Sequence, residues 1–221
     1  TVKTAQVRLK VAKTGVELGG RSGLIQVHAF EPATPEKIDR SWYQQSPDSL
    51  VDFAYNSSGY AGLGFSRNPK NGIKANLGRG LIGLPFLVQH QLPQRSPRRA
   101  KAAADTIVRE DSRLVLQAPL EQGATWIALD IRLGMDNTQF RSRRTVLGDT
   151  TIRSPAGRYD VEQVRTAGNV GGTTFQFSDF YSEAGLIKRA YTDTLQRRDD
   201  DGTILGKFIV REVHTLTDHQ D

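Results

Sequence analysis

Apolar residues alternate with polar ones through most of the chain, and this period of two constrains the fold more than any other feature. In the segment ATWIALDIRLG the alternation would place one set of side chains on a single face: Thr125, Ile127, Leu129, Ile131 and Leu133. Comparable runs recur in QVRLKVAK, SLVDFAYNSSG, TTFQFSDFYS and TILGKFIVREVHTL. Alternation bounded by Gly, Pro, Asn and Asp is typical of antiparallel strands with one buried face. We therefore predict a mainly β fold: a single curved antiparallel sheet or half-open barrel, with little helix and one long irregular insertion.

Turn and helix signals divide this pattern into elements. The segments SPAGRY and RRDDDGT predict tight connections, the first through Pro155 and Gly157 and the second through Asp201 and Gly202. Helical periodicity is scarce by comparison. TPEKIDRSWYQQ could begin a helix with Thr34 as its N-cap, and the Ala-rich SPRRAKAAADTIVRED could form two helical turns.

The length of the chain permits one large domain without covalent cross-links. Its 221 residues can bury a sizeable core, and they include no cysteine. This composition excludes a disulfide scaffold, a thiolate nucleophile and a cysteine-ligated metal. We therefore expect a single β-rich domain over residues 1–221, containing an irregular basic and apolar arm at residues 59–101.

Charge is distributed unevenly along the chain. The net charge is +6, from 30 basic and 24 acidic residues. Between Asp52 and Asp105 there is no acidic residue but there are eight Lys and Arg residues, so this interval carries +8 and the rest of the chain −2. A local excess of this kind indicates an anionic partner for one segment.

The arm combines this charge with apolar residues. In RGLIGLPFLVQHQLPQRSPRRAK an apolar run precedes a Pro- and Arg-rich tail. One interpretation is a long ordered loop over an open edge of the core. The other is a docking arm with these partner-binding residues: Leu84, Phe86, Leu87, Arg95, Arg98 and Arg99. Its partner would be a larger membrane protein complex or an anionic membrane surface. Nucleic acid is disfavoured, because Phe86 is the only aromatic residue in the quoted segment.

Motifs that commonly mark enzymes, cofactor sites and metal sites have ordinary explanations here. GRGLIG matches a dinucleotide-binding pattern, but Pro85 and the polar flanks do not fit the strand and helix that this motif requires. His214 and His219 lack the cysteines of a zinc finger, and RDDDG lacks the ligand spacing of a calcium loop. We therefore expect no catalytic residues, no cofactor, no metal site and no established small-molecule substrate.

Three segments in the C-terminal half resemble a known group of proteins. LVLQAPLEQGATW (Leu114 to Trp126) has a Pro-Leu, a Gly and a Trp that opens a strand. TTIRSPAGRYDVEQVR (Thr150 to Arg165) has a Pro-Ala-Gly turn, and SDFYSEAGLIKRAY (Ser178 to Tyr191) has an aromatic pair before a Gly-Leu and a Lys. In this order they resemble uncharacterised bacterial envelope proteins, often lipoproteins, built on a curved antiparallel β-sheet. The resemblance implies an extracytoplasmic β-domain, periplasmic or on the outer face of the envelope, and implies no catalytic residue.

Three functions remain open at this point. The first is a non-enzymatic accessory or scaffolding subunit, peripheral to the membrane and docked on a larger membrane protein complex. The second is a carrier that holds a small lipid-like ligand in a β-sheet cavity. The third is a hydrolase. A cavity lined by Trp42, Trp126 and Phe residues would favour the carrier, and a titratable cluster in a cleft would favour the hydrolase.

Overall fold

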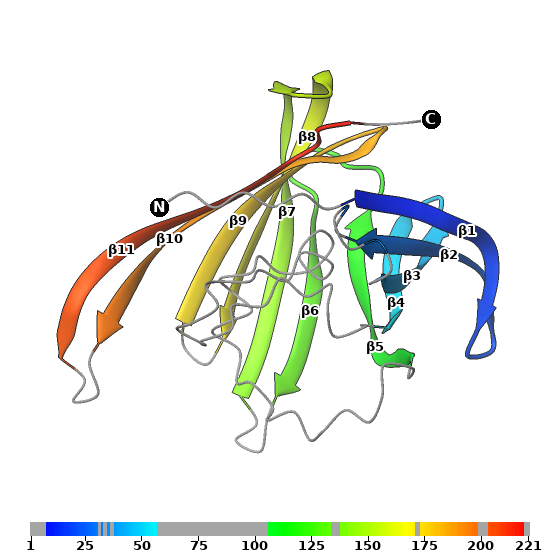
Figure 1. The fold of residues 1–221 in the computed structure, drawn as a ribbon, viewed down its shortest axis with the longest axis horizontal. Helices are drawn as coiled ribbons and strands as arrows, with labels where there is room; N and C mark the ends of the chain where they lie inside the picture. The colour runs from blue at the N-terminus through cyan, green and yellow to red at the C-terminus, as the bar shows by residue number, and fades with distance from the viewer. Residues whose placement is uncertain are drawn as a thin grey trace. The chain divides into compact units, whose positions relative to one another are not determined.

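The structure is a computed structural model that describes residues 8–30, 32, 35, 38–56, 106–133, 138–170, 173–198 and 203–218. Over these residues all regular secondary structure is β-strand (Figure 1). The strands in chain order are β1 (Arg8–Leu18), β2 (Arg21–Phe30), β3 (Asp39–Ser46), β4 (Ser49–Asn56), β5 (Ile107–Gln117), β6 (Thr125–Leu133), β7 (Thr138–Ser154), β8 (Gly157–Val170), β9 (Thr173–Ser182), β10 (Gly185–Arg198) and β11 (Ile204–Thr215). Within these ranges no helix is long and apolar enough to cross a membrane. The predicted mainly β fold is confirmed.

The strands form two antiparallel sheets, whereas the sequence predicted a single curved sheet or a half-open barrel. The five-stranded sheet has the order β1-β2-β3-β4-β5, and the six-stranded sheet has the order β11-β10-β9-β8-β7-β6. Within each sheet, strands that are consecutive in the chain pair with each other, whereas the consecutive strands β5 and β6 belong to different sheets. Where the sequence analysis predicts one domain, the chain divides into two compact units: Thr1–Pro119 with Ile131–Asn137, and Leu120–Asp130 with Thr138–Asp221.

The five-stranded sheet begins with a tight hairpin. Leu18 pairs with Arg21 across Gly19 and Gly20, whose φ angles are 58° and 77°. A two-residue hairpin turn with positive φ at both positions suits glycine, which has no Cβ to clash. The core of this sheet consists of Leu24, Trp42, Phe53 and Ala54, against which Val16 and Leu18 pack.

The first predicted helix is wrong, because its C-terminal part is strand β3. Trp42 and Tyr43, each 5% exposed, are buried in this strand, and Trp42 pairs with Gln26 on one side and Ala54 on the other. A short isolated helix is marginal, so burying two large aromatic side chains in a sheet outweighs the capping signal at Thr34. In the second predicted helix, residues 107–111 belong to β5, and residues 96–105 lie outside the described residues.

Two predicted hairpins organise the six-stranded sheet. The β7–β8 hairpin closes at the pair Ser154 and Gly157, and the backbone N–H of Ala156 donates to Ser154 Oγ at 3.2 Å, which confirms the turn in SPAGRY. Strands β10 and β11 pair antiparallel down to Arg198 and Ile204, as expected on either side of RRDDDGT. The turn residues 199–202 lie outside the described residues.

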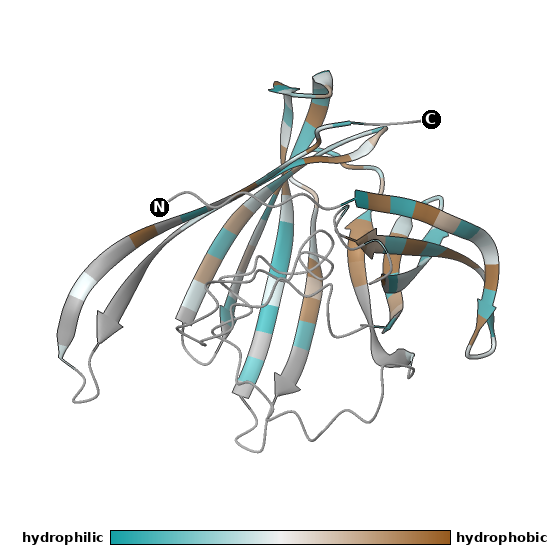
Figure 2. Cartoon of the chain, in the orientation of Figure 1, coloured by the Kyte–Doolittle hydropathy of each residue, from teal (hydrophilic) through white to brown (hydrophobic). Residues whose placement is uncertain are grey.

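Strand β6 departs from strict alternation, because Leu129 of the predicted face and Trp126 of the opposite phase are both buried. Trp126 and Leu129 are buried at 6% and 8% exposure, whereas Ile127 is exposed at 36% and Thr125 is exposed as well. The indole of Trp126 has a larger apolar surface to remove from water than the side chain of Ile127 has. Burial alternates along β7 from Ser142 to Val146 and along β9 from Phe175 to Tyr181, and Figure 2 shows hydrophobic and hydrophilic bands following one another along the strands.

Candidate functional site

The partner-binding residues predicted from the sequence belong to the arm and lie outside the described residues: Leu84, Phe86, Leu87, Arg95, Arg98 and Arg99. The described structure shows only where the arm is inserted. It connects β4 to β5, and these two strands pair with each other, with Tyr55 opposite Ile107. The docking role of the arm residues therefore stays a prediction.

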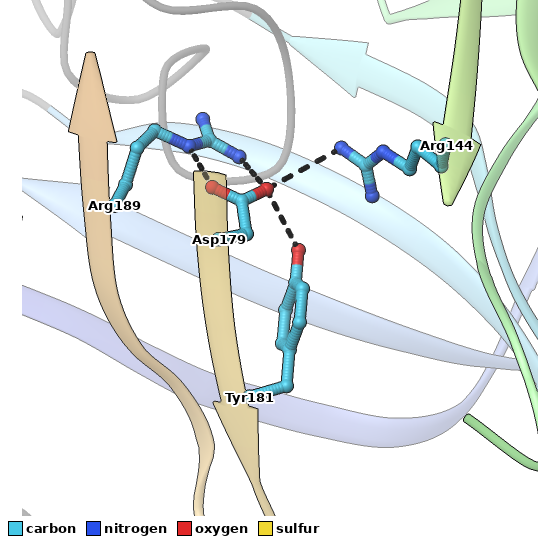
Figure 3. Close-up of polar contacts among 4 residues, drawn as sticks. All are labelled: Arg144, Asp179, Tyr181 and Arg189. Atoms are coloured by element: carbon cyan, nitrogen blue, oxygen red, sulfur yellow. Dashed lines mark hydrogen bonds and ion pairs between the residues drawn. The ribbon is translucent and has the colours of Figure 1, made fainter. Parts of the chain in front are cut away.

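The six-stranded sheet buries one face, here called the inner face, and this face carries charged groups. Its buried apolar side chains include Val146, Val164, Phe175, Phe177, Ile187 and Tyr191. Among them lie Arg144, Asp179, Tyr181 and Arg189, here called the Asp179 cluster (Figure 3). Asp179 and Arg189 are fully buried, and Arg144 is 3% exposed. Ionised side chains are rarely buried this deeply without close partners.

Strand register explains how residues far apart in the sequence form this cluster. Asp179 on β9 lies opposite Arg189 on β10 and opposite Val164 on β8. Arg144 on β7 lies opposite Thr166, two residues along β8 from Val164, so its side chain crosses β8 to reach Asp179. Tyr181 follows Asp179 by two residues and therefore projects from the same face of β9. The cluster thus connects β7, β9 and β10.

The Asp179 carboxylate accepts contacts at both oxygens. Arg189 donates from Nε to Oδ1 at 2.5 Å and from Nη2 to Oδ2 at 2.7 Å, which is a bidentate pair. The Tyr181 hydroxyl donates to Oδ2 at 3.2 Å, and Arg144 Nη2 lies 3.7 Å from the same oxygen. The Arg189 guanidinium carbon also lies 4.8 Å from the centre of the Phe177 ring, a cation–π distance.

The electrostatics of the cluster favour a structural role. Burial, and then the charge of Asp179, raise the pKa of Tyr181 to about 12, although the charges of Arg144 and Arg189 act in the opposite direction. The hydroxyl therefore keeps its proton at neutral pH and acts as a donor. Because both oxygens of Asp179 already accept hydrogen bonds, neither is presented to a substrate as a general base would be. The arrangement is better suited to holding three strands together than to proton transfer.

Sequence reasoning missed the Asp179 cluster, although the sequence carries a signal for it. In TTFQFSDFYS, Asp179 occupies the same alternating positions as Phe175, Phe177 and Tyr181, all of which are buried. A charged residue in the apolar phase of a strand indicates a buried ion pair. Arg189 gives the same signal, since it shares its phase with the buried Tyr191.

The described histidines lie in different sheets. His28 on β2 is flanked across the five-stranded sheet by Lys10 and Arg40. Desolvation, and then the charges of Arg40, Lys10 and Lys13, lower the pKa of His28, which favours its neutral form. His214 on β11 lies opposite Arg189. Over the described ranges no group of three or more His, Cys, Asp or Glu side chains could hold a metal ion.

The opposite side of the six-stranded sheet, here called the outer face, carries cations. They occupy the strand positions that alternate with the buried ones: Arg141, Arg143, Arg165, Lys188 and Arg211. Arg141 Nε lies 3.3 Å from the carboxylate of Asp130 on β6. Among the residues that the structure describes, no ion pair joins the other four cations to an acid.

Exposed apolar side chains gather at the edges of both sheets. Those that are large and exposed in the described part of the chain are Leu9, Val11, Ile127, Ile209 and Val213. The first two lie on β1, the edge of the five-stranded sheet, and the others lie on β6 and β11, the two edges of the six-stranded sheet. In these ranges, exposed large apolar residues therefore occur on edge strands alone.

Comparison of the chain with models of protein families, with curated proteins and with solved structures found no match in any of the three. The resemblance to bacterial envelope proteins therefore stays a prediction. The features that bear on function are the charged outer face, the apolar edge strands and the buried Asp179 cluster.

Proposed function

We propose that this chain is a non-enzymatic extracytoplasmic accessory subunit, peripheral to the membrane, that docks on a larger membrane protein complex through the edge strands of its sheets. The observation that supports this proposal is the placement of the exposed apolar side chains. Ile209 on β11 is 76% exposed and Val11 on β1 is 57% exposed. On β1 and on β11, two such side chains lie two or four residues apart on one face of the strand, and exposed apolar side chains close together commonly mark a contact with another protein.

An edge strand offers more than apolar area to a partner. It presents backbone N–H and C=O groups along its unpaired side, and an added strand from another protein would pair with them. On β11 the exposed side chains Ile209 and Val213 flank the exposed Arg211, so the strand combines two apolar contacts with one cation. A partner strand with an acidic residue between two apolar ones would complement this pattern.

The arm extends the same proposal to the part of the chain between β4 and β5. Its apolar residues Leu84 and Phe86 and its arginines Arg95, Arg98 and Arg99 would contact the same complex or the anionic membrane surface beside it. The apolar residues would contribute most of the affinity, and the arginines would make attachment sensitive to salt. The carrier hypothesis stays a prediction.

Native complex size tests the edge-strand contact. Membranes from the cells that make this protein would be extracted with mild detergent and separated by native electrophoresis. The chain is expected in a large complex, and the double variant Ile209→Ser, Val213→Ser is expected at the mass of the free chain. The matched control is the double variant Ala167→Ser, Thr192→Ser. Both positions are exposed and lie on β8 and β10, which are not edge strands of this sheet. Wild type that migrates as the free chain, or an edge variant that stays in the complex, would contradict the proposal.

A second pair of variants separates the arm from the edge strands. Leu84→Ser with Phe86→Ser is expected to release the chain from the complex while its cooperative thermal unfolding is retained. If this variant loses cooperative unfolding, the apolar run belongs to the core, and the interpretation as a loop over the core edge is correct. Replacing Arg95, Arg98 and Arg99 with Gln should weaken attachment most at low ionic strength, where charge is least screened.

A further inference from the structure

Apart from Arg211, the cations of the outer face take no part in the edge-strand contact, and together they extend across most of the six-stranded sheet. Arg143 lies on β7, Arg165 on β8, Lys188 on β10 and Arg211 on β11. Arg143 and Arg211 are exposed, and Arg165 and Lys188 are half-buried. Four cations on four different strands therefore point to the same side of the sheet.

The strand register spreads these charges over a surface. Arg143 lies opposite Ala167, so it is a diagonal neighbour of Arg165 at roughly 7–8 Å between their backbones. Neighbouring strands are about 4.8 Å apart, so β7 and β11 are separated by roughly 19 Å across the sheet. Charges spaced in this way do not converge on one small anion. They would meet several negative groups that are themselves arranged over a surface.

The residues between the cations are neutral and polar. On the described part of this face they include Thr145, Gln163, Asn169, Thr174, Gln176, Ser178 and Thr192. Asp130, at the β6 edge, is the acid on the described part of this face, and it pairs with Arg141. The other cations are thus left to attract negative charge from outside the sheet.

We infer that the outer face of the six-stranded sheet docks on the anionic phospholipid headgroups of a bilayer. A bilayer surface presents phosphate groups in two dimensions, which matches cations spread over β7 to β11. This inference rests on the proposed function only in placing the chain next to a membrane.

The same face is poorly suited to single-stranded nucleic acid. Binding of that kind relies on aromatic side chains on which bases stack. Phe180 and Tyr159 are the aromatic side chains on the described part of the outer face, and both are half-buried. The chemistry therefore favours lipid phosphate, and an oligonucleotide serves as the competing ligand in the test.

Vesicle co-sedimentation with the purified full chain tests the inference. The vesicles would contain phosphatidylcholine alone or phosphatidylcholine mixed with phosphatidylglycerol. The face variant changes Arg143, Arg165, Lys188 and Arg211 to Gln. The matched control removes the same charge at exposed positions elsewhere: Lys10, Lys13, Arg153 and Arg158 to Gln. Thermal unfolding of both variants would first establish that each is folded.

Wild type is expected to bind the anionic vesicles and not the neutral ones, and to be released by salt. The face variant should lose at least about tenfold in partitioning, and the control less than about threefold, because only cations near the headgroups contribute. Equal losses in the two variants would show that net charge alone drives binding and would overturn the inference. The inference would also be overturned if the face variant bound the anionic vesicles normally but no longer bound a single-stranded oligonucleotide. Because the vesicles contain no protein, failure here would leave the edge-strand proposal to be decided by native complex size.

Discussion

Two adjacent arginines in β7 have opposite surroundings. Arg143 is exposed on the outer face, whereas Arg144 is 3% exposed on the inner face and lies 3.7 Å from Asp179. Strand β10 repeats the contrast with Lys188 outside and the fully buried Arg189 inside. Successive side chains of a strand point to opposite faces, so one position along the chain separates a solvated cation from a buried ion pair. A basic run in a strand sequence therefore cannot be assigned as a whole to binding or to the core.

The two faces also differ in what their charges contribute to stability. Exposed ion pairs in water contribute about 0–1 kcal/mol, because solvent already stabilises the separated charges. Removing one partner from a buried pair costs about 3–5 kcal/mol, because the remaining charge stays buried without compensation. If this contrast holds, substitutions on the inner face will unfold the chain, and matched substitutions on the outer face will alter only what it binds.

The largest effect is expected at the two aspartates. Asp179→Ala would leave two guanidinium groups without their shared carboxylate and should lower the free energy of unfolding by about 3–5 kcal/mol in a urea titration. Asp130→Ala, which removes the exposed partner of Arg141, should cost less than about 1 kcal/mol. If Asp179→Ala fails to fold, the apolar triple variant Arg144→Met, Asp179→Leu, Arg189→Met should recover folding. Similar losses for the two aspartates would remove the distinction between the faces.

A comparable effect is expected for the aromatic residue of β6. Trp126→Ala should destabilise the chain by about 3–5 kcal/mol, because the indole is 6% exposed and its removal leaves a cavity. Ile127→Ala is the neighbouring control, and at 36% exposure it should cost no more than about 1 kcal/mol. Thermal unfolding of both variants measures the difference. An unchanged melting temperature for Trp126→Ala would show that the indole is solvated.

Deprotonation of Tyr181 should lower the free energy of unfolding at alkaline pH. Its pKa is raised from 10.0 to about 12, so the folded chain holds this proton more tightly than the unfolded chain. The resulting stabilisation is complete below the unfolded pKa and is lost as pH rises from about 10 to 12. The difference in unfolding free energy between wild type and Tyr181→Phe should therefore shrink by about 2–3 kcal/mol over that window. Between pH of about 7 and 9 it should stay constant, and a constant difference up to pH of about 12 would contradict the prediction.

The smallest of these effects concerns the close packing of β8 with its neighbours. A Cβ added at Gly168 would lie 2.4 Å from Phe175 Cζ and 2.6 Å from the backbone oxygen of Arg141. Gly168→Ala should therefore cost about 1–3 kcal/mol, since a rigid backbone atom cannot move aside cheaply. Ala167→Ser, at the neighbouring exposed position, should change stability by less than about 0.5 kcal/mol. Equal unfolding midpoints for the two variants would show that the strands adjust freely.

The sequence predicted much of the local structure. The alternation of apolar residues indicated antiparallel strands, and SPAGRY indicated the turn between β7 and β8. These features are local, because a strand and its hairpin turn depend on residues within a few positions of one another. The signal for the buried charges was present as well, since Asp179 and Arg189 stand in the apolar phases of their strands.

Which strands become neighbours, and which phase of each strand is buried, was decided by the tertiary structure. Local alternation defines two sets of side chains, whereas β6 buries Trp126 from one set and Leu129 from the other. The helical signal at Thr34 was overridden because β3 pairs with β2 and β4 and buries Trp42. The Asp179 cluster forms only because β7 pairs with β8, β8 with β9 and β9 with β10 in registers that align Arg144, Asp179 and Arg189. Pairing between strands is set by the combined burial of many side chains, and no short segment contains that information.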